Sequence, residues 1–287
     1  MSVRTALGNP WGKPRFLWVV GIGYVVWTLI PIVTAVLFSF NSTRSISSFT
    51  GFSMRWWLWD PDDSLMKDPQ IRDAIVQTLK LAALTTVIAV PLGVGFALAL
   101  DRWRGRTATS TNFLMMFSFI TPELILAVSL FLLFINAFDV IGLGTTAQLL
   151  GLTVLALAYP VVIVRARLVS LGRDMEEAAV DLGCSPTQSL WRVTLPLLLP
   201  AILASAAIVF ALALEDFVTV QQLSRDAPTT TVSMYIYGTA RGAPTPSANA
   251  VGTLMLSAST LIIILAYLFY RRSVRRQGRM TTRVELA

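Results

Sequence analysis

The sequence contains no histidine and a single cysteine, Cys184, in 287 residues. One cysteine cannot form a disulfide within the chain, and the usual nitrogen and sulfur ligands of a metal site are missing. The sequence offers no recognisable catalytic set of a nucleophile, a general base and a residue that orients the base. Histidine, the commonest general base, is absent. A Gly-x-x-x-x-Gly-Lys-Ser/Thr phosphate-binding loop is also absent. These absences argue against a metal centre, most enzyme chemistries and nucleotide binding by this chain.

Charge is scarce too, because only 14% of the residues are charged while 55% are hydrophobic and the mean hydropathy is +0.67. The apolar residues form long unbroken blocks, which is typical of an integral membrane protein. About 20 helical residues cross a hydrocarbon core of about 30 Å. The third block, Thr107 to Phe138, is interrupted by Glu123 alone. We therefore predict an all-α integral membrane fold over residues 16–270, with about six transmembrane helices near residues 16–40, 76–100, 111–135, 143–164, 197–220 and 247–270.

The basic residues are unevenly distributed between the connections. Of the 23 Lys and Arg residues, 16 lie in alternate connections that include both termini. The positive-inside rule therefore places the tails, residues 1–15 and 271–287, in the cytoplasm. The net charge of +7 then marks topology and does not indicate nucleic acid binding. Because the first apolar stretch is too long for a signal peptide, we expect a retained helix.

Three tryptophans, Trp56, Trp57 and Trp59, lie in the predicted outer connection of residues 41–73 beside several acidic residues. Tryptophan is enriched at membrane interfaces, so we favour an interfacial anchor. The alternative is a docking surface for an external protein.

Small residues mark two of the predicted spans. The fifth is rich in alanine and serine, and the second contains Pro91, Gly93 and Gly95. Small side chains let helices approach closely in lipid. We expect both helices to lie against neighbouring helices or a partner protein.

The cytoplasmic connection of residues 165–196 is polar but strongly patterned. Apolar residues at helical spacing predict a short amphipathic helix with one stripe, formed by Leu171, Met175, Ala178 and Leu182. Gly183 is placed to end this helix, since glycine takes the left-handed cap conformation without a steric clash.

A second short helix is predicted after that turn. Ser185 fits its N-cap, Pro186 its first helical position and Gln188 a capping box. The Leu195-Pro196 step should end it, because proline disfavours helix in the preceding residue. The connection is therefore predicted as helix, turn, helix.

Spaced residues of this connection also follow a known pattern. Glu177-Ala178-Ala179, then Gly183, then Val193-x-Leu195-Pro196 resembles the EAA loop of ABC importer permeases, with Val193 in place of the usual isoleucine. The resemblance implies a type I ABC importer transmembrane domain in the bacterial inner membrane. It also implies that Glu177, Ala178, Ala179, Gly183, Leu195 and Pro196 couple to a separate ATPase subunit that binds ATP and Mg, while this chain binds no cofactor. An amphipathic helix lying on the membrane is the alternative.

Three acidic residues, Glu123, Glu215 and Asp216, lie within predicted spans. Ionisable groups inside the membrane are costly, which makes them candidate functional residues. Pro122 should kink the third span beside Glu123 and free a carbonyl. Adjacent helical residues point about 100° apart, so at most one of Glu215 and Asp216 should face a central path. These carboxylates would suit a cationic substrate, and acids bonded to neighbouring backbone or hydroxyls are the alternative.

The surroundings of these acids are similar to the spermidine/putrescine subgroup of the same permeases. The resemblance rests on the segment from Leu214 to Ala250, on Pro122-Glu123, and on residues 52–56 of the outer connection. It implies a second homologous permease, an ATPase, and an external binding protein that delivers a polyamine.

Two other functions stay open at this stage. Related subgroups carry iron, thiamine, sulfate or other small solutes on the same scaffold. An ATP-independent secondary transporter would use the intramembrane acids as ion sites, although no convincing pair of interrupted helices in inverted halves supports it.

Overall fold

The computed structural model describes residues 15–102, 110, 113, 120–137, 141–242 and 244–285, and these residues are helical apart from connections and an isolated bridge between Asn41 and Phe52. In chain order the elements are α2 (Arg15–Phe38), η1 (Arg55–Trp59), α3 (Pro69–Arg102), α5 (Glu123–Asn136), α6 (Thr145–Ala156), α7 (Ala158–Leu171), α8 (Asp174–Asp181), α9 (Pro186–Ser189), η2 (Leu190–Thr194), α10 (Leu195–Glu215), α11 (Val218–Leu223), η3 (Ala227–Thr229), α12 (Val232–Arg241) and α13 (Pro246–Glu285).

Five helical segments of the described chain are long and apolar enough to cross a membrane. They are Phe16–Phe38, Pro69–Arg102, Thr145–Leu171, Pro186–Glu215 and Pro246–Leu268. The third predicted span corresponds to α5, which has 14 residues and is therefore about 21 Å long. Most of residues 111–119 of that span lie outside the described residues. The last helix, α13, continues through the basic segment that the sequence separates as a tail.

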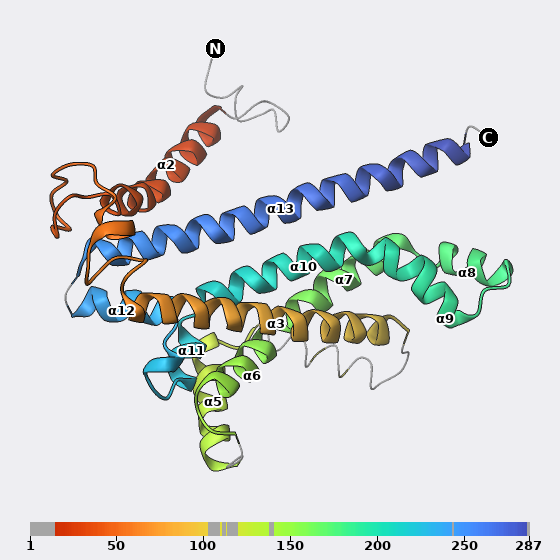
Figure 1. Cartoon of the computed structure of the whole chain (residues 1–287). Helices are drawn as coiled ribbons and strands as arrows, with labels where there is room; N and C mark the ends of the chain where they lie inside the picture. Colours follow the sequence, from red (N-terminus) through yellow and green to blue (C-terminus); the bar gives the residue numbers. More distant parts are fainter. Residues whose placement is uncertain are drawn as a thin grey trace.

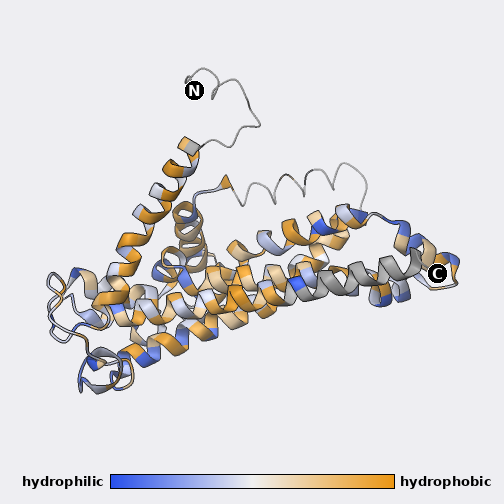
Figure 2. Ribbon diagram, turned by 90° about the horizontal axis from the view of Figure 1, so that it is seen from above, coloured by the Kyte–Doolittle hydropathy of each residue, from blue (hydrophilic) through white to orange (hydrophobic). Residues whose placement is uncertain are grey.

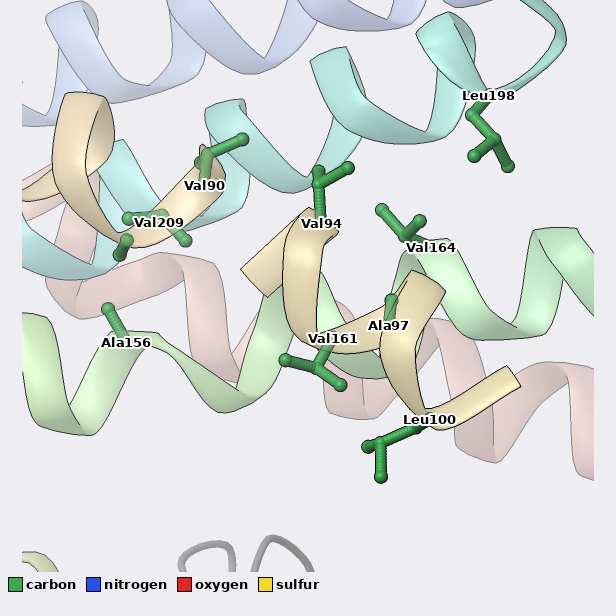
Figure 3. Close-up of a cluster of buried hydrophobic side chains, with 10 residues drawn as sticks. Val90, Val94, Ala97, Leu100, Ala156, Val161, Val164, Leu198 and Val209 are labelled. Carbon is green, nitrogen blue, oxygen red and sulfur yellow. The ribbon is translucent and has the colours of Figure 1, made fainter. Parts of the chain in front are cut away.

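Helices α3, α7 and α10 lie side by side at the centre of the bundle (Figure 1). Val94 of α3, Val161 of α7 and Val209 of α10 are buried in one cluster, whose members converge in Figure 3. In lipid, close packing and dispersion replace the hydrophobic effect as the force between helices. Complementary shape at this cluster therefore holds the three helices together.

Gly93 is where α3 and α7 require a small residue. A Cβ atom built on Gly93 would lie 2.5 Å from Cγ of Pro160, whereas one built on Gly95 would meet nothing within 4 Å. The expected close approach therefore depends on Gly93, and Gly95 takes no part in it.

We expect Gly93→Ala to lower the free energy of unfolding by about 1–3 kcal/mol, because the new methyl group overpacks the α3–α7 contact. Gly95→Ala is the matched control and should be neutral or stabilising by up to about 1 kcal/mol, since alanine favours helix. Thermal unfolding of both variants in detergent measures the difference. Equal unfolding midpoints would contradict the contact.

The two ends of the bundle carry different elements. Figure 1 places α8 and α9 at one end, and α11, α12 and the segment that precedes α3 at the other. Apolar residues cover the middle of the bundle and polar residues gather at the ends, as Figure 2 shows. This separation matches a membrane protein whose 165–196 connection faces the opposite side from its 41–73 connection.

Helix α2 projects away from the bundle in Figure 2 and is exposed from Phe16 to Thr34, while its last turn contacts α13. Phe16 is 78% exposed, Trp27 is 73% exposed, and no residue of its most apolar window is buried. A helix that is apolar on all sides needs lipid or another protein around it.

The tryptophans before α3 form the interior of a small folded segment. Trp56 is fully buried and its Nε1 donates a hydrogen bond to the carbonyl of Asn41 at 2.7 Å, while Nε1 of Trp57 donates to the carbonyl of Ser39 at 3.2 Å. The expected interfacial anchor is therefore wrong for Trp56, and Trp57 is half-buried with its N–H already satisfied. Trp59, at 68% exposure, is still free to contact lipid or protein.

Asp60 fixes the end of η1 in the same segment. Its carboxylate accepts hydrogen bonds from Nε of Arg55 at 2.7 Å and from the backbone N–H groups of Asp63 and Asp62. Burial alone would raise the pKa of Asp60, but these hydrogen bonds outweigh it and hold the pKa below its ordinary value. The charged group therefore stabilises this segment at neutral pH, and that contribution is lost as the pH falls through the lowered pKa.

Candidate functional site

Asp216 lies at a bend between two helices. Helix α10 ends at Glu215 because Asp216 adopts the extended values φ −57° and ψ 126°. The Asp216 carboxylate then accepts hydrogen bonds from the backbone N–H groups of Thr219 at 3.0 Å and Val220 at 3.1 Å, which begin α11. A single continuous span over 197–220 is therefore wrong. The N–H groups at the start of a helix lack intrahelical partners, and the carboxylate supplies one.

Glu123 is also placed by a break in the chain. It is the first residue of α5, and Pro122 before it is extended, with φ −57° and ψ 131°. Glu123 therefore begins a helix and does not lie midway along a continuous one. The carbonyl that Pro122 would free in a continuous helix belongs to Ser118, which lies outside the described residues.

The two breaks bring all three predicted acids to one cavity. Glu123, Glu215 and Asp216 line a space of about 540 Å³ between α5, α6, α7 and the α10–α11 bend. The carboxyl groups of Glu123 and Asp216 interact directly. Both Glu215 and Asp216 line this space, where the helix break at Asp216 removes the 100° spacing of an unbroken helix, and which of them faces a central path stays a prediction. None of the described lining residues is lysine or arginine.

Aromatic side chains complete the wall of the cavity. Tyr159 of α7 and Phe217 line it with the acids. The Phe217 ring packs on Tyr237 of α12 with centroids 4.6 Å apart, and the Arg241 guanidinium lies 4.5 Å from the Tyr237 centroid. Oγ of Ser233 also donates a hydrogen bond to the Asp216 carbonyl at 2.7 Å. Helix α12 therefore contacts the bend at both Asp216 and Phe217.

A buried amide network holds the elements behind the bend. Nε2 of Gln77 donates to Oγ1 of Thr145 at 2.9 Å and to Oε1 of Gln148 at 3.0 Å. Nε2 of Gln148, which is fully buried, donates to the carbonyls of Val220 at 3.0 Å and Thr229 at 2.9 Å. Sequence reasoning missed these residues, although amides inside apolar spans were an available signal, since polar groups in membranes bond across helices.

The connection between α7 and α10 has the predicted helix–turn–helix form. Helix α8 is followed by Gly183 at φ +87°, a left-handed conformation that suits glycine. Ser185 accepts a hydrogen bond from the backbone N–H of Gln188, and the Gln188 side chain accepts one from the backbone N–H of Ser185, which completes the capping box. These local predictions are confirmed, while the coupling role of Glu177, Ala178, Ala179, Gly183, Leu195 and Pro196 stays a prediction.

The expected stop at Leu195-Pro196 is wrong. Leu195 is helical, with φ −62° and ψ −43°, and the chain stays helical from Pro186 to Glu215. The segment η2 is a π-helical turn in which the N–H of Leu195 donates to the carbonyl of Leu190, five residues back. A wider turn gives the ring of Pro196 room that an α-helix lacks, so the proline reshapes the helix without ending it.

The apolar stripe of α8 faces outward in this chain. Leu182 is 88% exposed and Met175 is 56% exposed, while only Ala179 is buried against the rest of the protein. Trp191 of η2 is 71% exposed as well. The expected stripe is split: Leu171 ends α7 and packs against the central cluster, while Met175, Ala178 and Leu182 are exposed. A cluster of exposed apolar side chains at one end of a protein marks an interaction surface.

Residues 89–279 match the family described as binding-protein-dependent transport system inner membrane component. The chain is 31% identical to the putrescine transport system permease protein PotI of Escherichia coli (strain K12), covering 87% of this chain and 88% of that protein. It is 30% identical to the spermidine/putrescine transport system permease protein PotC of Haemophilus influenzae, with coverage of 85% and 92%. It is also 28% identical to the molybdenum transport system permease protein ModB of Mycobacterium bovis, with coverage of 83% and 92%.

A solved structure shows the same fold. A chain of a bacterial ABC transporter involved in the import of alginate superposes with a TM-score of 0.70 at 18% identity, covering 90% of this chain and 95% of that one. The predicted all-α transmembrane fold and the predicted role as a non-catalytic permease subunit are confirmed. This chain belongs to the binding-protein-dependent transport system inner membrane components and is a multi-pass permease subunit of an ABC importer.

Proposed function

We propose that this permease carries a polyamine of the putrescine or spermidine type across the inner membrane. The observation that carries the proposal is the cavity in which Glu123, Glu215 and Asp216 converge without a described basic residue. A polyamine is a chain of protonated amines joined by methylene groups. Carboxylates in a desolvated site compensate its charges, and the rings of Tyr159 and Phe217 offer faces for ammonium and methylene groups.

The negative charge of the residues that line the cavity distinguishes between the candidate solutes. An anion such as sulfate would bring its charge beside three carboxylates, and like charges at close range in a low dielectric repel strongly. The acid-lined cavity therefore supports a cation over an oxyanion. The polyamine transport named for two of the relatives supports the same choice.

We propose three protein partners for the chain. An ATPase that binds ATP and Mg covers the exposed apolar face of α8 and η2, to which Leu182 and Trp191 contribute. A second, homologous permease covers part of α2, which is exposed from Phe16 to Thr34. An external binding protein delivers the solute at the end of the bundle that carries α11 and α12, where Trp59 is also exposed.

We propose that both termini and the 165–196 connection lie in the cytoplasm, as the positive-inside rule indicates. Cys184, the single cysteine of the sequence, lies in that connection and reports its side directly. A membrane-impermeant maleimide should label it in inverted vesicles and leave it unlabelled in intact spheroplasts. The reverse pattern would contradict the orientation.

Uptake of labelled putrescine and spermidine by cells with and without this subunit tests the substrate. Uptake should depend on the subunit and should stop when ATP is depleted while ion gradients persist. Equal uptake in both strains would remove the polyamine assignment, and parallel arms with labelled thiamine, iron and sulfate would then identify the class. Uptake that survives ATP depletion would favour an ATP-independent transporter.

A further inference from the structure

Glu176, in the first turn of α8, connects three separate elements. Its Oε1 atom accepts a hydrogen bond from Nη2 of Arg102, the last residue of α3, at 2.7 Å. The same oxygen accepts a second hydrogen bond from Oγ1 of Thr194, the last residue of η2. We call these three residues the Glu176 clamp. One carboxylate therefore joins α8 to the end of α3 and to the start of α10.

A second polar contact runs parallel to the clamp. Nη2 of Arg173, at the start of α8, donates to the carbonyl of Asp101 at 3.1 Å and lies 3.7 Å from its Oδ2 atom. Both contacts join α8 to the final two residues of α3. The position of α8 relative to α3 is thus set by charged groups.

Among the described residues, the main other contacts of α8 are with the adjacent η2 and α9. It begins after Gly172 at φ +68° and ends at Gly183 at φ +87°, so glycine turns bound it on both sides. Ala179 is its only buried residue. A cavity of about 180 Å³ lies behind it, between α3, α7 and η2, and is lined by Glu176, Arg102 and other residues. Apolar packing therefore leaves α8 room to move, and the polar contacts determine where it sits.

We propose that Glu176 is the positioning residue that transmits a displacement of α8 to α3 and α10. The proposal rests on the proposed function, in which an ATPase moves α8. From Thr194 the helix continues as α10 to Glu215, where the acid-lined cavity begins. At 1.5 Å per residue its 21 residues span about 30 Å, so a shift at Thr194 reaches the α10–α11 bend through one continuous helix.

The exposure of the clamp suits this role. The Arg102 side chain is 44% exposed and that of Glu176 is 31% exposed. Exposed ion pairs contribute little to folding stability. Removing the Glu176 carboxylate should therefore leave the subunit folded and assembled, while α8 loses its link to α10 and keeps only the Arg173–Asp101 contact with α3.

The test measures how accessible the acid-lined cavity is to a thiol reagent, and no solute is added. Leu155 lines the cavity, so Leu155→Cys in a Cys184→Ser background gives a single reporter thiol there. In the assembled importer in proteoliposomes, ATP should change the rate at which an impermeant maleimide labels this thiol by at least about fivefold. Adding Glu176→Ala, which removes the Oε1 atom that accepts from Arg102 and Thr194, should reduce that change by at least about half while ATP hydrolysis stays within about twofold of the reference.

Matched variants distinguish a loss of transmitted motion from a general effect of charge removal or of unfolding. Asp174→Asn removes an exposed acid from the same helix and should keep the full ATP-dependent change. Thr194→Val keeps the side-chain volume without the hydroxyl and should weaken the change. The exchange Glu176→Arg with Arg102→Glu should restore it in part.

An ATP-dependent change of undiminished size in Glu176→Ala would overturn the clamp. So would its equal loss in Asp174→Asn. If the reference importer itself shows no ATP-dependent change, the ATP-driven function and the clamp fail together. Because no solute is present, a wrong polyamine assignment leaves the outcome unaffected and would show only in the uptake assay.

Discussion

Replacing Asp216 with asparagine should lower putrescine uptake by at least about tenfold, because a hydrogen bond to a charged group in a desolvated site contributes about 1.5–3 kcal/mol. Asparagine keeps the Oδ1 atom that accepts from the N–H groups of Thr219 and Val220, so the α10–α11 bend should persist. The variant therefore removes the charge and leaves the local structure. Initial rates of labelled putrescine uptake at equal membrane expression measure the effect.

Asp68→Asn is the matched control for this prediction. The Asp68 carboxylate also accepts a backbone hydrogen bond, from the N–H of Gln70 at 2.8 Å, but it lies outside the cavity. Its replacement should leave uptake unchanged. Since Glu123 and Asp216 interact directly, combining Glu123→Gln with Asp216→Asn should be less than additive. Normal uptake by Asp216→Asn would show that the carboxylate serves the bend alone.

Replacing Gly183 with valine should uncouple ATP hydrolysis from transport and lower uptake by at least about tenfold, because the left-handed conformation costs a β-branched residue about 1–3 kcal/mol. Gly183 sits at φ +87°, and a Cβ there meets no atom within 4 Å, so the expected effect arises from backbone strain and not from a clash. The strain should redirect the chain between α8 and α9 and displace the surface that we assign to the ATPase. Parallel measurements of ATP hydrolysis and solute uptake by the reconstituted importer give the amount of ATP hydrolysed per solute transported.

Cys184→Val places the same side chain one residue later, where φ is not positive, and should retain coupling. Glu177→Lys tests the same surface without backbone strain, because the Glu177 side chain is exposed and its reversal changes only the docking face. Unchanged uptake in both Gly183→Val and Glu177→Lys would defeat the assignment of the connection.

Local signals made the 165–196 connection predictable. The Gly183 turn and the capping box of Ser185 and Gln188 depend on a few adjacent residues, and both form as expected. The Leu195-Pro196 step was misjudged because the same local rule ignores a π turn, which accommodates proline within a continuous helix.

Features that depend on distant partners were not predictable in the same way. The bend at Asp216 falls in a segment with no glycine or proline, and the local hydrogen bonds from Thr219 and Val220 are joined by one from Ser233, which follows 17 residues later in the sequence. Trp56 is buried because Asn41 and its neighbours fold over it, which the aromatic composition of the segment does not indicate. Glu176 resembles its neighbour Glu177 in sequence, and its contacts with Arg102, 74 residues earlier, and with Thr194, 18 residues later, distinguish it.

The three acids of the cavity were predictable in part. Their presence in apolar spans singled out Glu123, Glu215 and Asp216 as candidates, since charge is costly in lipid. Their convergence required two helix breaks that periodicity alone does not show. The sequence therefore identified the residues, while the structure supplied their arrangement.

Photo-cross-linking from Cys184 tests whether the α8–α9 connection engages an ATPase. The native thiol lies one residue after Gly183, so a maleimide with a photoreactive group can be attached without introducing another cysteine. In inverted vesicles that contain the assembled importer, we predict an adduct with a nucleotide-binding subunit that Cys184→Ser abolishes. A thiol that yields adducts only with lipid or with proteins outside the membrane would contradict the account.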